Sequence, residues 1–173
     1  MIPDPQNVFE LLQNDVATQL MATSPFSTLS NPDGTTPFKV LTEDEGDIQF
    51  EYDQMIQQLG LSIVVHSPAG RIDQPDMPGP IITKLGFDVW VSEAPTFNRS
   101  EVGTQLRLWK ATTIVLGTLH GFQPQSIHSP IYADEVRLER ERSYIEGEGQ
   151  PGTLIVSRIC HFIAPQVAAE ISS

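Results

Sequence analysis

Residues 82–94, ITKLGFDVWVSEA, alternate between large apolar and smaller or polar side chains along most of their length. Leu85, Phe87 and Val89 fall on one side of an extended chain, and Trp90 falls on the other. Alternation with a period of two predicts a β-strand with one face in a hydrophobic core. The bulk of Trp90 gives the second face an apolar contact surface as well.

Other segments predict further strands around this one. LSIVVH (61–66) is a continuous apolar, β-branched run, which is typical of a buried strand. Segments 134–147 and 153–164 are joined by a short Gly/Pro-containing connector, so we expect an antiparallel hairpin. A short strand is also expected near 38–41.

Three segments have helical periodicity. Apolar residues recur at spacings of three and four in 6–21, 45–59 and 104–120. The sequence therefore predicts one α+β domain over 1–173, with a mixed, mainly antiparallel sheet of about four strands and two to three helices packed on it. Helices 6–21 and 104–120 are expected on one face. The Pro/Gly-rich stretch 67–80 predicts a loop or projecting arm.

The charge balance excludes some classes of partner. The chain has 173 residues, 22 acidic and ten basic, and a formal net charge of −12. Specific nucleic-acid binding and adhesion to an anionic membrane both need clustered lysine or arginine, so neither is expected. The acids are concentrated, because residues 1–70 carry ten of them and only one base, Lys39. No secretory signal and no membrane-length apolar run is visible, so we expect a cytoplasmic protein.

Residue types used in catalysis or metal binding lack the necessary spacing. None of the four histidines has the spacing of a metal-ligand pair. Cys160 precedes His161 directly, and neighbours along a strand point to opposite faces, so Cys160 is expected to be a buried structural residue. An EF-hand alignment of the acidic run fails, because Leu41 and Tyr52 would take ligand positions. We expect no enzyme activity, no catalytic residue, no cofactor and no metal.

A more specific motif follows strand 82–94. The strand ends in E-A-P-T-F-N-R (93–99), Gly-Thr follows at 103–104, and a helix closes on L-H-G-F (119–122). This order resembles small tail proteins of tailed bacteriophages, most closely the tail terminator or tail-completion group. The N-terminal amphipathic helix and the final hairpin also fit that group.

The resemblance implies a structural virion protein. Tail terminators form a ring, commonly six-fold, that ends the tail tube and joins the tail to the head. The implied partners are further copies of the chain, the tail tube protein, and neck or connector proteins, while DNA passes through the ring. The implied location is the virion tail, after assembly in the host cytoplasm. Another head–tail joining or minor tail protein is an alternative, since such neighbours reuse similar folds.

Self-association is expected through strand edges and the loop after strand 82–94. Strand 134–146 is predicted to carry its charges on both faces, as a strand that extends past the core would. An exposed edge that is simply blunted by charge is the alternative. The candidate interface residues are Trp90, Phe97, Asn98, Arg99, Arg140 and Arg142.

The acidic run suggests a channel wall. DNA must pass through such a ring without binding it, and carboxylates would repel phosphate. The candidates are Glu43, Asp44, Glu45 and Asp47. In the competing interpretation these residues lie on the outer surface and only confer solubility.

A second class of function remains open. The chain would then be a small enzyme or ligand-binding domain with a pocket formed by Trp90, Trp109 and His120. A monomer with a deep apolar cleft would favour this class, and a ring or higher oligomer would favour the structural protein.

Overall fold

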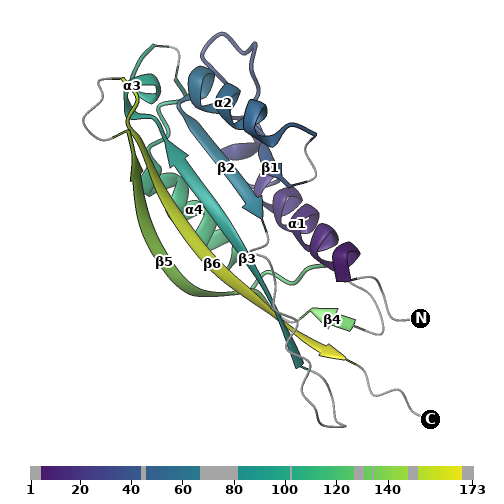
Figure 1. Ribbon diagram of the computed structural model, residues 1–173. Coiled ribbons are helices and arrows are strands. Elements are labelled where there is room, and N and C mark those ends of the chain that lie inside the picture. The colour runs from purple at the N-terminus through teal and green to yellow at the C-terminus, as the bar shows by residue number, and fades with distance from the viewer. Residues whose placement is uncertain are drawn as a thin grey trace, which may run out of the picture.

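The computed structural model describes residues 5–43, 46–66, 82–101, 103–126, 131–133, 135–147 and 152–168. In chain order (Figure 1) the elements are α1 (Pro5–Met21), the 3₁₀ turn η1 (Phe26–Thr28), β1 (Val40–Thr42), α2 (Ile48–Leu59), β2 (Leu61–His66), β3 (Ile82–Glu93), α3 (Pro95–Asn98), α4 (Leu108–Leu119), β4 (Ile131–Ala133), β5 (Arg137–Glu146) and β6 (Ile155–Ala168).

One mixed sheet organises the described residues. Its strands lie in the order β1-β2-β3-β6-β4, and β5 also pairs with β6. Only β1 and β2 run parallel, and every other pair is antiparallel. The edge of β6 away from β3 is shared, because β5 pairs with residues 155–163 and β4 with residues 166–168. The last described strand, β6, is therefore internal, and β5 forms a long outer edge (Figure 1).

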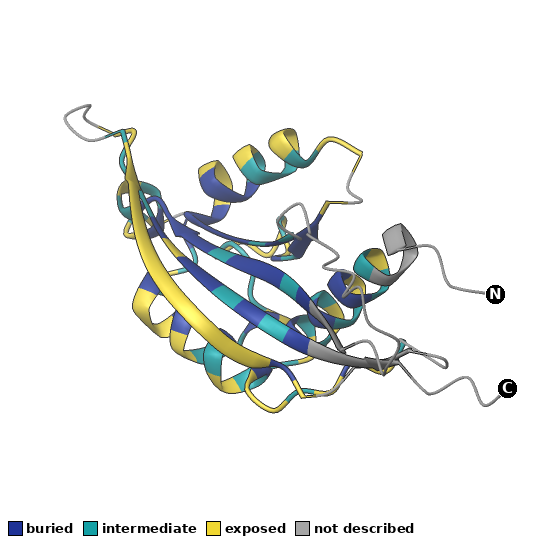
Figure 2. Cartoon of the chain, turned by 60° about the horizontal axis from the view of Figure 1, so that its bottom comes forward, coloured by how far each residue is buried: buried dark blue, intermediate teal, exposed yellow. Residues whose placement is uncertain are grey.

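Helices cover the two faces of the sheet unequally. α1 and α4 contact each other and lie against one face, over β1 to β3 and β6. α2 lies on the opposite side of the sheet, close to β1 and β2, and Figure 2 shows the two layers from below. Among the described residues, α2 is the helix on this second face, and much of the face beside β5 has no helix on it.

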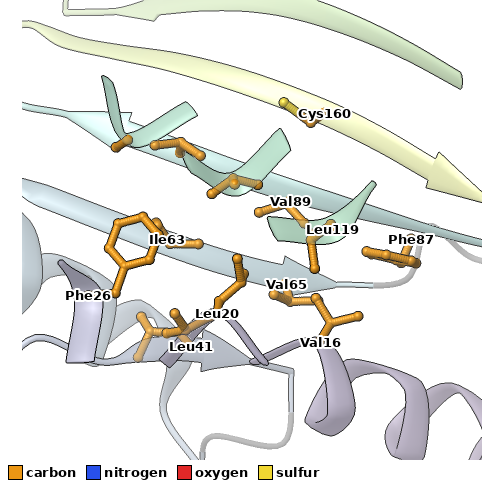
Figure 3. Packing of buried hydrophobic residues seen from close by; sticks show 14 of the residues in the cluster. Val16, Leu20, Phe26, Leu41, Ile63, Val65, Phe87, Val89, Leu119 and Cys160 are labelled. Atoms are coloured by element: carbon orange, nitrogen blue, oxygen red, sulfur yellow. The ribbon is translucent and has the colours of Figure 1, made fainter. Parts of the chain in front are cut away.

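The hydrophobic core lies between the sheet and the α1–α4 layer (Figure 3). Leu12, Val16 and Leu20 form the buried stripe of α1, at the spacing of four that predicted the helix. Alternate residues of β3 meet them, and Phe87 stacks on Phe162 of β6 with ring centroids 5.4 Å apart. The period-two pattern of 82–94 thus selects the buried face.

The structure confirms the predicted fold class and differs in several details. Within the described ranges the sheet has six strands rather than about four, because β1 and β4 are added at its margins. The hairpin of β5 and β6 is antiparallel as predicted. A short helix, α3, replaces the turn expected after β3, and Pro95 stands at its start. The predicted arm at 67–80 lies outside the described residues.

The helix predicted over 104–120 begins later, at Leu108. Gln105 has a positive φ of 62°, which no helical residue adopts, so residues 104–107 approach α4 as a loop. Three side chains in this loop and in β3 take part in the polar network described below. The predicted start of the helix was too early, because the spacing of apolar residues does not show that the backbone at Gln105 has a positive φ.

Candidate functional site

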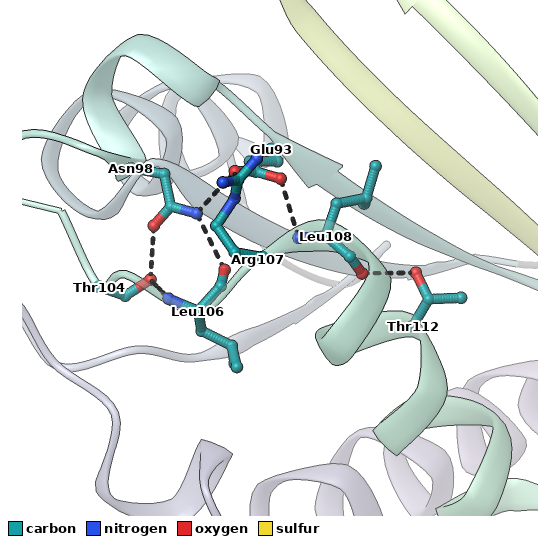
Figure 4. A network of polar contacts seen from close by, with 7 residues as sticks. All are labelled: Glu93, Asn98, Thr104, Leu106, Arg107, Leu108 and Thr112. Carbon is teal, nitrogen blue, oxygen red and sulfur yellow. Dashed lines mark hydrogen bonds and ion pairs between the residues drawn. The ribbon is translucent and has the colours of Figure 1, made fainter.

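A buried polar network joins the end of β3 to the start of α4 (Figure 4). The Glu93 side chain is only 3% exposed, and its carboxylate accepts hydrogen bonds from three different donors. Arg107 donates through Nε at 2.6 Å, and the Leu108 amide donates to the second carboxylate oxygen at 2.8 Å. The carboxylate therefore also lies at the positive N-terminal end of α4. These contacts satisfy a charge that would otherwise be costly to bury.

The Asn98 side chain belongs to this network and does not lie on the surface. Its amide nitrogen donates to Glu93 and to the Leu106 carbonyl oxygen at 3.0 and 2.9 Å, and its oxygen accepts from Thr104. The side chain is fully buried. The hydrogen bonds of the Asn98 side chain are made within the chain, and its predicted contact with a neighbouring subunit stays a prediction.

The other candidate interface residues have different environments. Arg99 is exposed and makes no ion pair with the described residues, whereas Phe97 is partly buried. Arg107, which the sequence did not single out, is the structural arginine of this region. The sequence does contain a carboxylate, Glu93, and an arginine, Arg107, at the two ends of this region. The spacing of residues could not predict the loop that brings the two side chains together.

Strand β5 is exposed at every one of its ten residues. Within the part of the chain that the structure describes, one edge pairs with β6 and no strand pairs with the other. Figure 2 shows this strand as a continuous exposed band along the sheet margin. Tyr144 and Ile145 are each 52% exposed, so the edge carries apolar surface as well as charge. Long exposed edges of this kind are templates for association.

The charges of β5 are sorted by face. The register places Arg137, Arg140 and Arg142 opposite Ile163, His161 and Ile159, on the sheet face away from α1 and α4. We call these three residues the arginine row. Charges thus lie on both faces of β5, as predicted, and a bulge between Leu138 and Arg140 keeps the three arginines on one side. Glu141 lies on the other face and pairs with Arg158 at 3.3 Å.

A groove lies on the same face, between α2 and the sheet. It has a volume of about 480 Å³. Three carboxylates line it, with the rings of Tyr52, Trp90 and Tyr144, the imidazole of His66, and aliphatic and small polar side chains, and among the described residues lining it there is no lysine or arginine. We call it the acidic groove and define it by Glu43, Tyr52, Asp53, Trp90, Tyr144 and Glu146.

The inner part of the groove is aromatic. Trp90 meets His66 edge-on, with ring centroids 5.1 Å apart. The Trp90 indole nitrogen is shielded from solvent and has no acceptor among the described residues, which costs about 1–3 kcal/mol for a buried donor. Burial raises the pKa of Tyr52, and a hydrogen bond with Ser92 opposes that shift in part. Trp90 was predicted as an interface residue, and the structure places it in this groove.

A histidine between two carboxylates lies further along this face. His161 Nδ1 is 2.5 Å from Asp88, and Nε2 is 3.2 Å from Glu139 of β5. Both ring nitrogens therefore have partners, and the side chain is 12% exposed. His161 is therefore a mostly buried histidine whose polar atoms are both satisfied. Gly86 accommodates the ring, because a Cβ there would lie 3.0 Å from His161 Cε1.

The residues proposed for an enzyme or ligand pocket do not come together. Trp90 lines the groove, but Trp109 is 69% exposed on α4, in the layer on the opposite face of the sheet. His120 follows α4 and is also exposed. In the described ranges no three His, Cys, Asp or Glu residues are grouped as a metal site. Cys160 is buried, as expected, and its neighbour His161 lies on the other face.

The candidate channel acids are only partly described. Glu43 lines the acidic groove and accepts a hydrogen bond from Gln13 at 2.7 Å. Asp47 is the N-cap of α2, where its side chain accepts from the Phe50 amide at 3.0 Å. Asp44 and Glu45 lie outside the described residues. The capping role of Asp47 supports a local structural function, and the channel assignment stays a prediction.

Comparisons with known proteins identify no family. No model of a known protein family matches the chain, and a search of curated proteins found no match either. No helix in the described ranges is both long enough and apolar enough to span a membrane. The exposed strand and the groove are therefore interpreted from their own geometry.

Proposed function

We propose that this protein is a structural subunit of a tailed-bacteriophage virion, a tail terminator whose copies form a ring that ends the tail tube and joins it to the head. The observation that carries the proposal is β5, a ten-residue edge strand on which every residue is exposed. Long edges are a liability in a monomer, and natural proteins normally shorten or cover them. An edge of this length fits a chain that meets other copies.

The composition of the surface supports the same function. Large exposed apolar side chains occur on β5 and also on α2 and α4, at Phe50 and Trp109. Exposed apolar residues on several faces suit a subunit that contacts more than one partner. A ring needs two different surfaces on each subunit, one for each neighbour, because its contacts are heterologous. The tail tube and the neck or connector proteins are the further partners.

Two measurements test this function. Sedimentation and electron microscopy of the purified chain should reveal rings, with six subunits as the expected number. Deleting the gene from its parent phage genome should yield tails of uncontrolled length that fail to join heads, since nothing ends tube growth. Uniform, head-joined tails in the deletion would overturn the terminator assignment.

The neighbouring assignment, another head–tail joining or minor tail protein, gives a different result. Tails would then have normal length but lack a head or a minor component. Labelling the protein on intact virions would locate it between tail and head for a joining protein and elsewhere on the tail for a minor component. Labelling distinguishes these cases without relying on assembly of the isolated chain.

A further inference from the structure

Unpaired positive charge is concentrated on one strand. Of the lysines and arginines whose side chains the structure describes, Lys39, Arg107 and Arg158 make ion pairs. Arg99 and Lys110 are exposed singly on other elements. The three residues of the arginine row therefore have no ion-pair partner in the described part of their own chain, and the acid on the same face of β5, Glu139, contacts His161 instead.

The acidic groove has the complementary chemistry. Asp53, Glu146 and Glu43 supply negative charge from α2, β5 and the segment after β1. Tyr52, Tyr144 and Trp90 supply aromatic faces, which attract a guanidinium as well as its apolar stem. A planar guanidinium bound between carboxylates and aromatic rings is a favourable arrangement. The groove therefore suits an arginine side chain.

The arginines of the same copy do not fill this groove. Arg142, Tyr144 and Glu146 succeed one another on one face of β5, and only the last two are lining residues. Both surfaces lie on the open face of the sheet, so they are available to another copy at once. Two surfaces of opposite charge on one molecule form a self-complementary pair.

Pairing of sheet edges does not provide the same contact. The opposite edge strand, β1, is buried at all three residues, so β5 is the one long exposed edge of the described sheet. Joining β5 to β5 would give a two-fold pair that stops there. A side chain that enters a groove on a second copy can repeat from subunit to subunit.

We propose that the arginine row of one copy docks at the acidic groove of a second copy, with Arg142 placed against Asp53. This inference rests on the proposed function, since it names the contact that would join neighbouring subunits. It also assigns the groove an occupant, the basic strand of the same protein. Tyr144 and Trp90 then pack on the stem of the incoming arginine.

A charge-reversal cycle tests the contact. Arg142→Glu should raise the dissociation constant for self-association at least tenfold, measured by sedimentation velocity across a concentration series. Asp53→Arg should do the same. The double variant R142E/D53R should recover most of the lost affinity, and a mixture of the two single variants should associate better than either alone. Circular dichroism checks that each variant is folded.

Two matched controls carry the same change of charge elsewhere. Lys110→Glu on α4 and Glu101→Arg after α3 both alter exposed residues outside the groove and outside β5. Neither should change the dissociation constant more than about threefold. Equal effects from the controls and the test variants would show that only net charge matters, and would overturn the inference.

The outcomes separate this inference from the proposed function. Rings that persist unchanged in R142E and D53R would overturn the arginine contact and leave the terminator function standing. Rescue by the double variant in a particle that is only a dimer would support the contact and contradict the ring. Binding of duplex DNA, measured by fluorescence anisotropy, that is lost in R142E while self-association is unchanged would assign the arginine row to phosphate and overturn the inference.

Discussion

The Glu93 carboxylate is almost fully buried, and both of its oxygens accept hydrogen bonds. It links three segments, the end of β3, the loop through Arg107 and the first residue of α4. Removing one member of such a pair leaves the other charge or donor without its partner, which is more costly than losing a surface ion pair. The network therefore holds the motif region in place.

Substitution at this position should be strongly destabilising. We expect Glu93→Ala to lower the free energy of unfolding by about 3 kcal/mol or more, because Arg107 and the Leu108 amide lose their acceptor. Urea denaturation measures the change. The exposed Glu101→Ala is the control and should stay within about 0.5 kcal/mol of the wild type. Equal values for the two variants would contradict a structural role for Glu93.

The Cys160 thiol provides a second residue-level test. Burial raises its pKa from an ordinary value of 9.0 to about 12, and the charge of Glu141 adds to the shift. The native protein should therefore not react with maleimide or Ellman's reagent at pH 8, and should react once urea unfolds it. Rapid labelling of the folded chain would contradict the buried position.

The same shift has a consequence for stability against pH. A thiol whose folded pKa lies above its unfolded value favours the folded state while it is protonated. This contribution is present below about pH 9 and is lost as the pH rises toward 12. Cys160→Ala should therefore lose less stability than the wild type over that alkaline range, as measured by urea denaturation at pH 8 and pH 10.5.

Among the elements, the junction of α2 with α3 depends on one glycine. Gly60 ends α2 with φ 71°, and a Cβ there would lie 2.3 Å from the Asn98 backbone nitrogen. The Gly60 carbonyl oxygen also accepts from the Ala94 amide at 3.0 Å. Close approach and a positive φ thus both require glycine, and the position ties α2 to the motif that follows β3.

A pair of alanine substitutions tests this requirement. Gly60→Ala should lower the thermal midpoint markedly, because both the backbone conformation and the contact oppose a side chain. Gly117→Ala is the matched control, since it lies within α4 with no atom within 4 Å of the added Cβ. It should stabilise the protein by about 0.5–1 kcal/mol, the helix preference of alanine over glycine. A loss of stability in both variants would contradict the position of Gly117 in α4, on which the control depends.

For the whole molecule, the sheet should respond unevenly to solvent. β3 and β6 are internal strands, whereas β5 is exposed along its length. Backbone amides of β3 should therefore exchange most slowly in a hydrogen-exchange experiment, and those of β5 much faster at low protein concentration. Raising the concentration should protect β5 selectively if this strand contacts other copies. Protection of β5 that is already equal to that of β3 in the dilute protein would contradict its exposed edge.

Much of the architecture could be predicted because its signals are local. The alternation in 82–94 and the stripe of α1 each report a repeat of the backbone itself, so both the element and its buried face follow from a dozen residues. The α+β class, the hairpin of β5 and β6, and the shared face of α1 and α4 were obtained in this way. Cys160 and His161 were also placed on opposite faces correctly, by the same period of two.

The candidate site depended on relations that no local repeat contains. Asn98 looks like a turn residue in the sequence, and only the approach of Glu93 and Thr104 makes it an internal one. A bulge after Leu138 decides that three arginines share a face, although simple alternation would have divided them. The acidic groove joins residues from α2, β3 and β5, which are far apart in the chain. Periodicity thus determined the elements and their buried sides, while loop geometry and strand register, set by packing across the sheet, decided which charges face one another.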